Sequence, residues 1–396
     1  MSLPEKTNNF FQKNKDRVVF RLNKYKAKLL DYFIDVCVLL LIPKIAYYLR
    51  SMFKKSEKDL IIGIFRQGGV GDRIVLGAFA AAVERRFPNS HITAIVNNSK
   101  DPLIGHPSID RIKLHNRWLH LEKVEKFNQK KYDIFYSLRY VPKVFVNSTR
   151  LIDYKSQVEK IFNKYSQEFH ESLKGTTPRS LNTLGVNGVD LLTQFSAIEG
   201  GQKDLFIRIS ESDRKILTSI PFSQYITINN GQFRGRETRC WPTDHWSQLV
   251  EKIKGIGHRV ILLGIESDEY VDGCYDLRGK TSLYEAAAII EKAILHVDTE
   301  GGMVFIAKAV RKKSIVLFGP DYPEFFGLEG NINLRKNNIC KPCCDQDFWR
   351  WKCHLGYERC KAMEAIKPEE VFSLIVNELK IDWLKVELVN QNKKLD

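Results

Sequence analysis

The stretch Asp59–Pro88, DLIIGIFRQGGVGDRIVLGAFAAAVERRFP, decides how the chain folds. It opens with a short, β-rich apolar run of the kind that forms a strand buried on both faces. A glycine turn follows at Gln67–Gly71, and after it Val75, Phe79 and Val83 recur every four residues, as on the apolar face of a helix. We therefore predict a strand, a glycine loop and a helix that lies close to a sheet.

Asp72 stands where the glycine loop becomes the helix. The positive end of a helix dipole stabilises a carboxylate there. Aspartate is also a favoured residue for capping a helix, so spacing alone favours a cap over a catalytic base at the mouth of a cleft. The loop lacks the G-x-G-x-x-G order of a dinucleotide fingerprint.

Length and composition limit the class of protein. A chain of 396 residues predicts two domains, and 43% hydrophobic with 28% charged residues describes a globular protein. The net charge of +15 favours an anionic partner, either a phospholipid surface or a phosphorylated substrate. Nothing resembles a nucleic-acid module, so no nucleic-acid partner is predicted. Eight cysteines without a signal peptide predict a cytoplasmic protein with mostly reduced thiols.

Residues 1–58 carry about half of this positive charge, with 13 Lys and Arg against 5 Asp and Glu. The apolar run Val36–Ile42 is only seven residues long, too short to span a bilayer. We predict a basic amphipathic extension that lies on the cytoplasmic face of the inner membrane. The alternative is a helical appendage packed on the protein's own surface.

The rest of the chain reads as two α/β halves in tandem, which predicts a cleft between them. Basic residues in the segment 140–205 suit an acidic acceptor and equally suit a solvated helical face. The first half has strand patterns at 60–65, 91–96, 111–115 and 132–138, and the second at 224–230, 258–264, 293–297 and 314–319.

The pattern Arg66-x4-Gly71-Asp72, followed by Arg86-Phe87-Pro88 and the strand HITAIV, resembles the start of glycosyltransferase family 9, the lipopolysaccharide heptosyltransferases. The resemblance implies the GT-B architecture, in which two Rossmann-like domains face each other across a cleft. It implies an acceptor domain at 59–215 and a nucleotide-sugar domain at 216–396. In this family the aspartate aligned with Asp72 is the proposed base, and Arg66 and Gly71 would lie beside it on the acceptor side.

Gly231-x7-Arg239 resembles the family motif that holds the donor. The family usually has Lys where Arg239 stands, and this cation neutralises the leaving diphosphate. Arginine can do the same with a bidentate fork. The resemblance places Gly231, Gln232 and Glu266 on the donor, Glu266 in an acidic loop where relatives hold the ribose. Which acid of this loop would serve stays open.

Glu300-Gly301-Gly302-Met303 resembles the family's Asp-Thr-Gly turn, with Glu300 aligned on the aspartate. Asp298 is the rival if the register slips by two residues. The glycines would let backbone amides approach a diphosphate at a helix N-terminus. Phe305 stands where the family usually has His, so the donor can differ from the usual one.

The segment 340–360 is rich in cysteine, and a C-terminal helix follows it. Cys340, Cys343, Cys353 and Cys360 resemble the family's cysteine tail, and a subset of protein heptosyltransferases is associated with an iron-binding cysteine finger. Four thiolates can hold Zn²⁺ or iron tetrahedrally, which would make the metal structural. The alternative is a set of reduced thiols without metal.

The resemblance predicts an inverting glycosyltransferase that needs no cofactor for catalysis. It would transfer heptose from ADP-heptose to a lipopolysaccharide core or related surface glycan, with Asp72 as general base. Two alternatives remain: a protein (autotransporter) heptosyltransferase with a metal-binding finger, and an inactive membrane-bound scaffold of the same fold.

Overall fold

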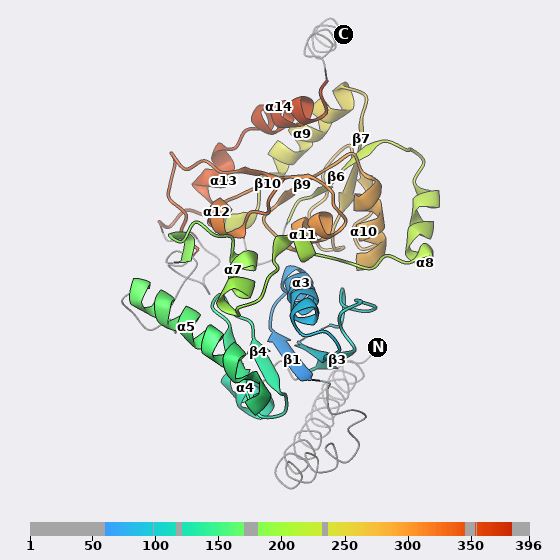
Figure 1. Ribbon diagram of the computed structural model, residues 1–396. Helices are drawn as coiled ribbons and strands as arrows, with labels where there is room; N and C mark the ends of the chain where they lie inside the picture. The colour runs from blue at the N-terminus through green and yellow to red at the C-terminus, as the bar shows by residue number, and fades with distance from the viewer. Residues whose placement is uncertain are drawn as a thin grey trace, which may run out of the picture. The chain divides into compact units, whose positions relative to one another are not determined.

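The computed structural model describes residues 60–97, 99–115, 121–169, 181–231, 237–344, 353 and 355–381. These residues belong to one compact unit that contains two sheets (Figure 1). The predicted basic extension at 1–58 and the predicted donor residue Gln232 lie outside the described residues. Among the helices of the described ranges, none is both long and apolar enough to cross a membrane.

The first sheet has the strand order β3-β2-β1-β4-β5. Parallel pairs join all its strands except β5, which runs antiparallel to β4. A purely parallel sheet was predicted, and β5 departs from it because only five residues connect the two strands, enough for a hairpin but too few for a crossover. The strands are β1 (Ile61–Arg66), β2 (His91–Val96), β3 (Arg111–Leu114), β4 (Ile134–Ser137) and β5 (Lys143–Val146).

Helix α3 (Val70–Arg86) packs between this sheet and the second half of the chain, which explains why it is apolar nearly all round. Gly77 lets it approach a buried histidine, since a Cβ there would lie 3.0 Å from the ring of His106. The other helices and turns of this half are α4 (Leu121–Asn128), η1 (Thr149–Leu151), α5 (Ile152–Phe169), α7 (Gly188–Phe195) and η3 (Gln202–Asp204).

The second sheet is wholly parallel, with the order β11-β10-β9-β6-β7-β8. Its strands are β6 (Tyr225–Asn229), β7 (Arg259–Leu263), β8 (Tyr275–Asp276), β9 (Leu295–Thr299), β10 (Ser314–Leu317) and β11 (Ile332–Leu334). All four strands predicted for this half are present, although β9 begins two residues later than predicted.

Helices cover the second sheet, and α9 (Thr243–Gly255) and α14 (Pro368–Glu378) lie side by side on one face (Figure 1). The remaining helices and turns are α8 (Glu211–Arg214), η4 (Lys215–Ser219), η5 (Glu237–Arg239), α10 (Leu283–Lys292), α11 (Gly302–Ala309), α12 (Pro323–Phe326) and α13 (Lys361–Ala365).

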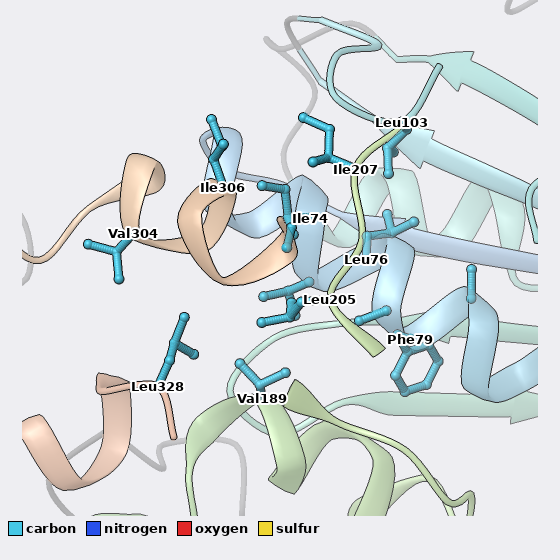
Figure 2. Close-up of a cluster of buried hydrophobic side chains, with 14 of the residues drawn as sticks. Ile74, Leu76, Phe79, Leu103, Val189, Leu205, Ile207, Val304, Ile306 and Leu328 are labelled. Atoms are coloured by element: carbon cyan, nitrogen blue, oxygen red, sulfur yellow. The ribbon is translucent and has the colours of Figure 1, made fainter. Parts of the chain in front are cut away.

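One cluster of buried apolar side chains runs through both halves. Ile74 of α3 lies near Ile306 of α11 and Leu205 of the connecting segment, and the same cluster includes Leu76 and Val304 (Figure 2). The first turns of α3 and α11 therefore meet within a continuous core. This contact fixes how the loops at the starts of the two helices face each other.

Candidate functional site

A cleft of about 1150 Å³ lies between the two sheets. Its walls come from loops that follow β1 and β4 in the first half and β6 and β9 in the second. In each sheet these are the neighbouring strands at which the strand order reverses direction along the chain. Ligands of open α/β sheets bind at such switch points, outside the carboxyl ends of the strands.

Asp72 lies in the first turn of α3 and contacts both the glycine loop and Arg66. Its Oδ2 accepts a hydrogen bond from the Gly69 amide at 2.9 Å, which caps the helix. Its Oδ1 lies 2.9 Å from Nη2 of Arg66 at the end of β1. The side chain is still 39% exposed and lines the cleft, so capping leaves it open to a ligand.

Arg239 lies on the opposite wall and is held by two carboxylates. Its Nε and Nη2 bind Asp321 at 2.8 and 2.9 Å, and its Nη1 lies 2.8 Å from Glu300. Burial lowers the pKa of Arg239, but Asp321 and Glu300 outweigh this effect and raise the pKa well above its ordinary value. The guanidinium is therefore a fixed positive charge whose hydrogen-bonding edges already face acids.

The glycine turn at the start of α11 approaches α3 closely. A Cβ on Gly302 would lie 3.2 Å from Cβ of Val70, and one on Gly71 would lie 2.8 Å from the Phe305 ring. Gly301, Gly302 and Met303 line the cleft together with Gly71. Phe305 thus packs against the glycine loop of the first half, where a histidine would present a polar ring.

Of the two rival acids near this turn, Glu300 contacts Arg239, while Asp298 is 1% exposed at the end of β9. Asp298 lies 3.4 Å from Nε2 of His296, and burial raises its pKa. Both acids reach the cleft wall. Asp298 is buried within the sheet, and only Glu300 lies on the loop that carries the glycines.

The acidic loop after β7 places Asp268 in the cleft wall, and the predicted donor residue Glu266 is exposed outside it. The reason is local, because Asp268 Oδ2 accepts a hydrogen bond from the Ile265 amide at 2.8 Å and closes the loop. This turn directs Glu266 away from the cleft. Gly231, also predicted on the donor side, does line the cleft and has a φ of +59°.

Three residues of the site were missed at the sequence level: Asp321, Arg139 and Tyr140. Asp321 follows β10 in an unremarkable Gly-Pro-Asp turn, yet it is fully buried against Arg239. Arg139 and Tyr140 follow β4, and the only available signal was their place at the carboxyl end of a predicted central strand. Burial raises the pKa of the Tyr140 hydroxyl well above its ordinary value.

A second hollow, of about 420 Å³, is lined by Cys340, Cys343, Cys353 and Cys360. Burial, together with the three neighbouring thiols, raises the pKa of Cys343 to about 12. Within the described part of the chain, however, no three His, Cys, Asp or Glu side chains are grouped so that they could hold an ion. As placed here, the four thiols share one hollow without forming a metal site.

Comparisons with known proteins bear on the whole arrangement. Residues 186–350 match the model of glycosyltransferase family 9 (heptosyltransferase), which confirms the predicted resemblance. Lipooligosaccharide heptosyltransferase 2 of Haemophilus influenzae is 33% identical over 98 residues. That match covers 22% of this chain and 28% of the relative's length.

Solved structures extend the likeness beyond these segments. The Escherichia coli ADP-heptose lipopolysaccharide heptosyltransferase II covers 81% of this chain and 98% of its own, with a TM-score of 0.53 and 17% identity. The iron-containing dodecameric glycosyltransferase TibC of enterotoxigenic E. coli covers 81% and 78%, with a TM-score of 0.55 and 13% identity. At such identities the likeness concerns the fold. It confirms the GT-B architecture of two Rossmann-like domains facing across a cleft.

Proposed function

We propose that the chain is an inverting glycosyltransferase, because residues 186–350 match the glycosyltransferase family 9 model. It moves a heptose from ADP-heptose to a lipopolysaccharide core or a related surface glycan. One observation carries the proposal. The Asp72 carboxylate at the start of α3 lines one wall of the cleft, and Arg239 of η5 and the glycine turn at the start of α11 line the opposite wall.

In this proposal Asp72 is the general base. It takes the proton of the acceptor hydroxyl as the oxygen attacks the anomeric carbon of the donor. The Arg66 guanidinium at 2.9 Å orients the carboxylate, and the Gly69 amide fixes its other oxygen. The base is therefore held in one orientation before the acceptor arrives.

The leaving nucleoside diphosphate would lie against the amides at Gly301–Met303, where the N-terminus of α11 favours negative charge. Arg239 adds a fixed positive charge, although two carboxylates already share it. A diphosphate that reaches this guanidinium has to displace one of them. The side chain of Glu300 is 11% exposed and that of Asp321 only 1%. Glu300 is therefore the carboxylate that can turn away from Arg239 and accept a hydrogen bond from a ribose hydroxyl instead.

The acceptor would enter from the side of β1 and β4, where Arg66 and Arg139 line the cleft. Arg139 is paired with the buried Glu125 at 2.8 Å, and Lys143 joins the same carboxylate at 2.9 Å. Two cations around one acid leave a positive balance that suits a phosphorylated or acidic glycan. We propose that the enzyme works at the cytoplasmic face of the inner membrane, with the basic residues 1–58 on anionic lipid.

Calorimetry with ADP, UDP, GDP and CMP tests the donor, followed by transfer assays with ADP-heptose. We expect ADP to bind most tightly, and Asp72→Ala to retain nucleotide binding while it loses transfer. Preference for UDP or GDP would keep the fold and the base but overturn the heptose assignment. No binding of any nucleotide would favour the inactive scaffold.

The four cysteines around one hollow favour a second candidate, a protein heptosyltransferase with a metal-binding finger. Its thiols would have to lose their protons and draw together, since metal ligands are thiolates. Metal content of the purified protein tests this, with Cys343→Ser compared with Cys274→Ser, a cysteine outside the hollow. Stoichiometric zinc or iron that only Cys343→Ser removes would support the finger, and its absence from the unmodified protein would reject it.

A further inference from the structure

A hydrogen bond joins the two halves at the rim of the cleft. The Tyr284 hydroxyl in α10 donates to Oδ1 of Asp101 at 3.1 Å, and these residues lie 183 positions apart in the chain. Proximity to Asp101 contributes, after burial, to raising the pKa of Tyr284 to about 12. Tyr284 therefore keeps the proton with which it makes this bond across the neutral pH range.

The bond continues to the loop that carries the base. The Asp101 carbonyl accepts a hydrogen bond from Nε of Arg73, and Nη1 of Arg73 donates to the Gly68 carbonyl at 3.1 Å. One buried guanidinium thus joins Asp101 to the glycine loop. Because Arg73 directly follows Asp72 in the first turn of α3, its anchorage fixes the backbone from which the Asp72 carboxylate projects.

The other end of this connection lies on the donor side. Ser282 caps α10 by accepting from the Glu285 amide at 3.2 Å, and both Ser282 and Leu283 line the cleft beside Tyr284. The start of α10 therefore contacts the cleft and the first half at once. A change in the position of this helix relative to the first sheet would strain or break the Tyr284–Asp101 bond.

We propose that Tyr284 is a positioning residue. Through Asp101 and Arg73 it aligns the loop that carries Asp72 with the donor half, so that the base is in register with a donor bound across the cleft. The inference rests on the proposed transfer activity, and Tyr284 itself contacts neither the donor nor the acceptor. Removing its hydroxyl should therefore affect turnover and leave donor affinity unchanged.

Tyr284→Phe keeps the ring and removes only the donor of this bond. We expect kcat to fall about tenfold, as for loss of a hydrogen bond to a charged group, while the KM for the donor changes less than twofold. Tyr275→Phe is the matched control, because its hydroxyl donates to the Ser219 carbonyl at 3.3 Å within the second half alone. That variant should keep the unmodified kcat.

A double-mutant cycle with Asp101→Ala separates this connection from general damage. If both residues act through one bond, the double variant should lose no more kcat than Asp101→Ala alone. Additive losses of kcat would overturn the proposal. So would a Tyr284→Phe variant that changes only KM, or one whose kcat equals that of Tyr275→Phe.

Hydrogen exchange gives a readout that does not depend on transfer. Tyr284→Phe should speed exchange at the amides of residues 68–72, and Tyr275→Phe should not. Should the unmodified protein transfer no sugar, the proposed function fails, and this exchange difference still decides whether Tyr284 holds the loop. Unchanged exchange would reject the positioning role whatever the activity.

Discussion

The two strand–glycine–helix units that meet at the cleft use their acids differently. In the unit β1–α3, Asp72 lies inside the first helical turn, pairs with one arginine and is 39% exposed. In the unit β9–α11, Glu300 precedes the helix, shares its arginine with Asp321 and is 11% exposed. The first unit presents the Asp72 carboxylate to the cleft, and the second holds the Arg239 cation between two acids.

This difference teaches what each unit can contribute to catalysis. An exposed carboxylate held by one partner can receive a proton, because solvent and substrate reach it. A partly buried cation held between two acids is rigid and can stabilise developing charge only when one acid gives way. We therefore expect substitutions in the first unit to affect chemistry and those in the second to affect donor binding and stability.

The largest effect is expected for Asp72→Asn. The amide still fits the cap but cannot take a proton, so kcat should fall by about 10²–10⁴-fold with donor KM nearly unchanged. Steady-state transfer kinetics measure this. A loss below tenfold would mean that Asp72 acts as a cap alone and would remove the contrast between the units.

The next largest effect is a loss of folding stability at acid pH, caused by a histidine that packs on helix α3 of the first unit. Burial lowers the pKa of His106, which packs on Gly77 of α3, from 6.5 to about 4. The unfolded chain thus binds the extra proton below about pH 6.5, and the stability gained from neutral His106 is lost as the pH falls toward 4. The loss should approach about 3 kcal/mol.

Denaturant unfolding at pH 7 and at pH 4.5 measures this loss. His106→Asn should flatten the difference between the two pH values. The same substitution at the half-exposed His91 should leave it unchanged. Equal pH dependence in all three proteins would place the acid sensitivity elsewhere in the molecule.

In the second unit, Asp321→Asn removes the buried charge that orients Arg239. Glu300 remains as a partner, so we expect about 2 kcal/mol of lost unfolding free energy and weaker nucleotide binding. Calorimetry of unfolding and of ADP binding checks both, with Glu324→Gln as an exposed acid neutralised nearby. Unchanged binding would show that Arg239 is an anchor only.

The smallest effect is expected where the units touch. Gly71→Ala adds a methyl 2.8 Å from the Phe305 ring, and the overpacking should exceed the gain in helix propensity by about 1 kcal/mol. Phe305→Leu in the same protein should recover most of this loss in a thermal melt. No recovery would mean that the two helices adjust independently.

Much of this arrangement was predictable from the sequence. The apolar run and glycine turn at 59–88 predicted β1 and α3, and their order with the later strands predicted two α/β halves. These elements were predictable from local sequence because their apolar residues recur with the short period of a strand or a helix. The antiparallel β5 was missed, because its four residues are too few to show a period and the strand is stabilised by pairing with β4.

The candidate site was predicted only where its residues stand in motifs. Asp72, Arg239 and Glu300 have such a context, whereas Asp321 comes to Arg239 from 82 residues away and only the fold brings them together. The family resemblance put Glu266 on the donor side and left open which acid of its loop would serve. A backbone hydrogen bond to Asp268 decides which acid faces the cleft, and sequence order does not contain that information.

The continuous core in Figure 2 has a consequence for any attempt to divide the chain. Ile74 of α3 and Ile306 of α11 belong to one buried cluster that both halves share, so neither half covers its own apolar face. A fragment that ends near residue 215 would expose that face and is expected to aggregate on expression. Added together as separate chains, the two fragments should instead rescue each other's solubility.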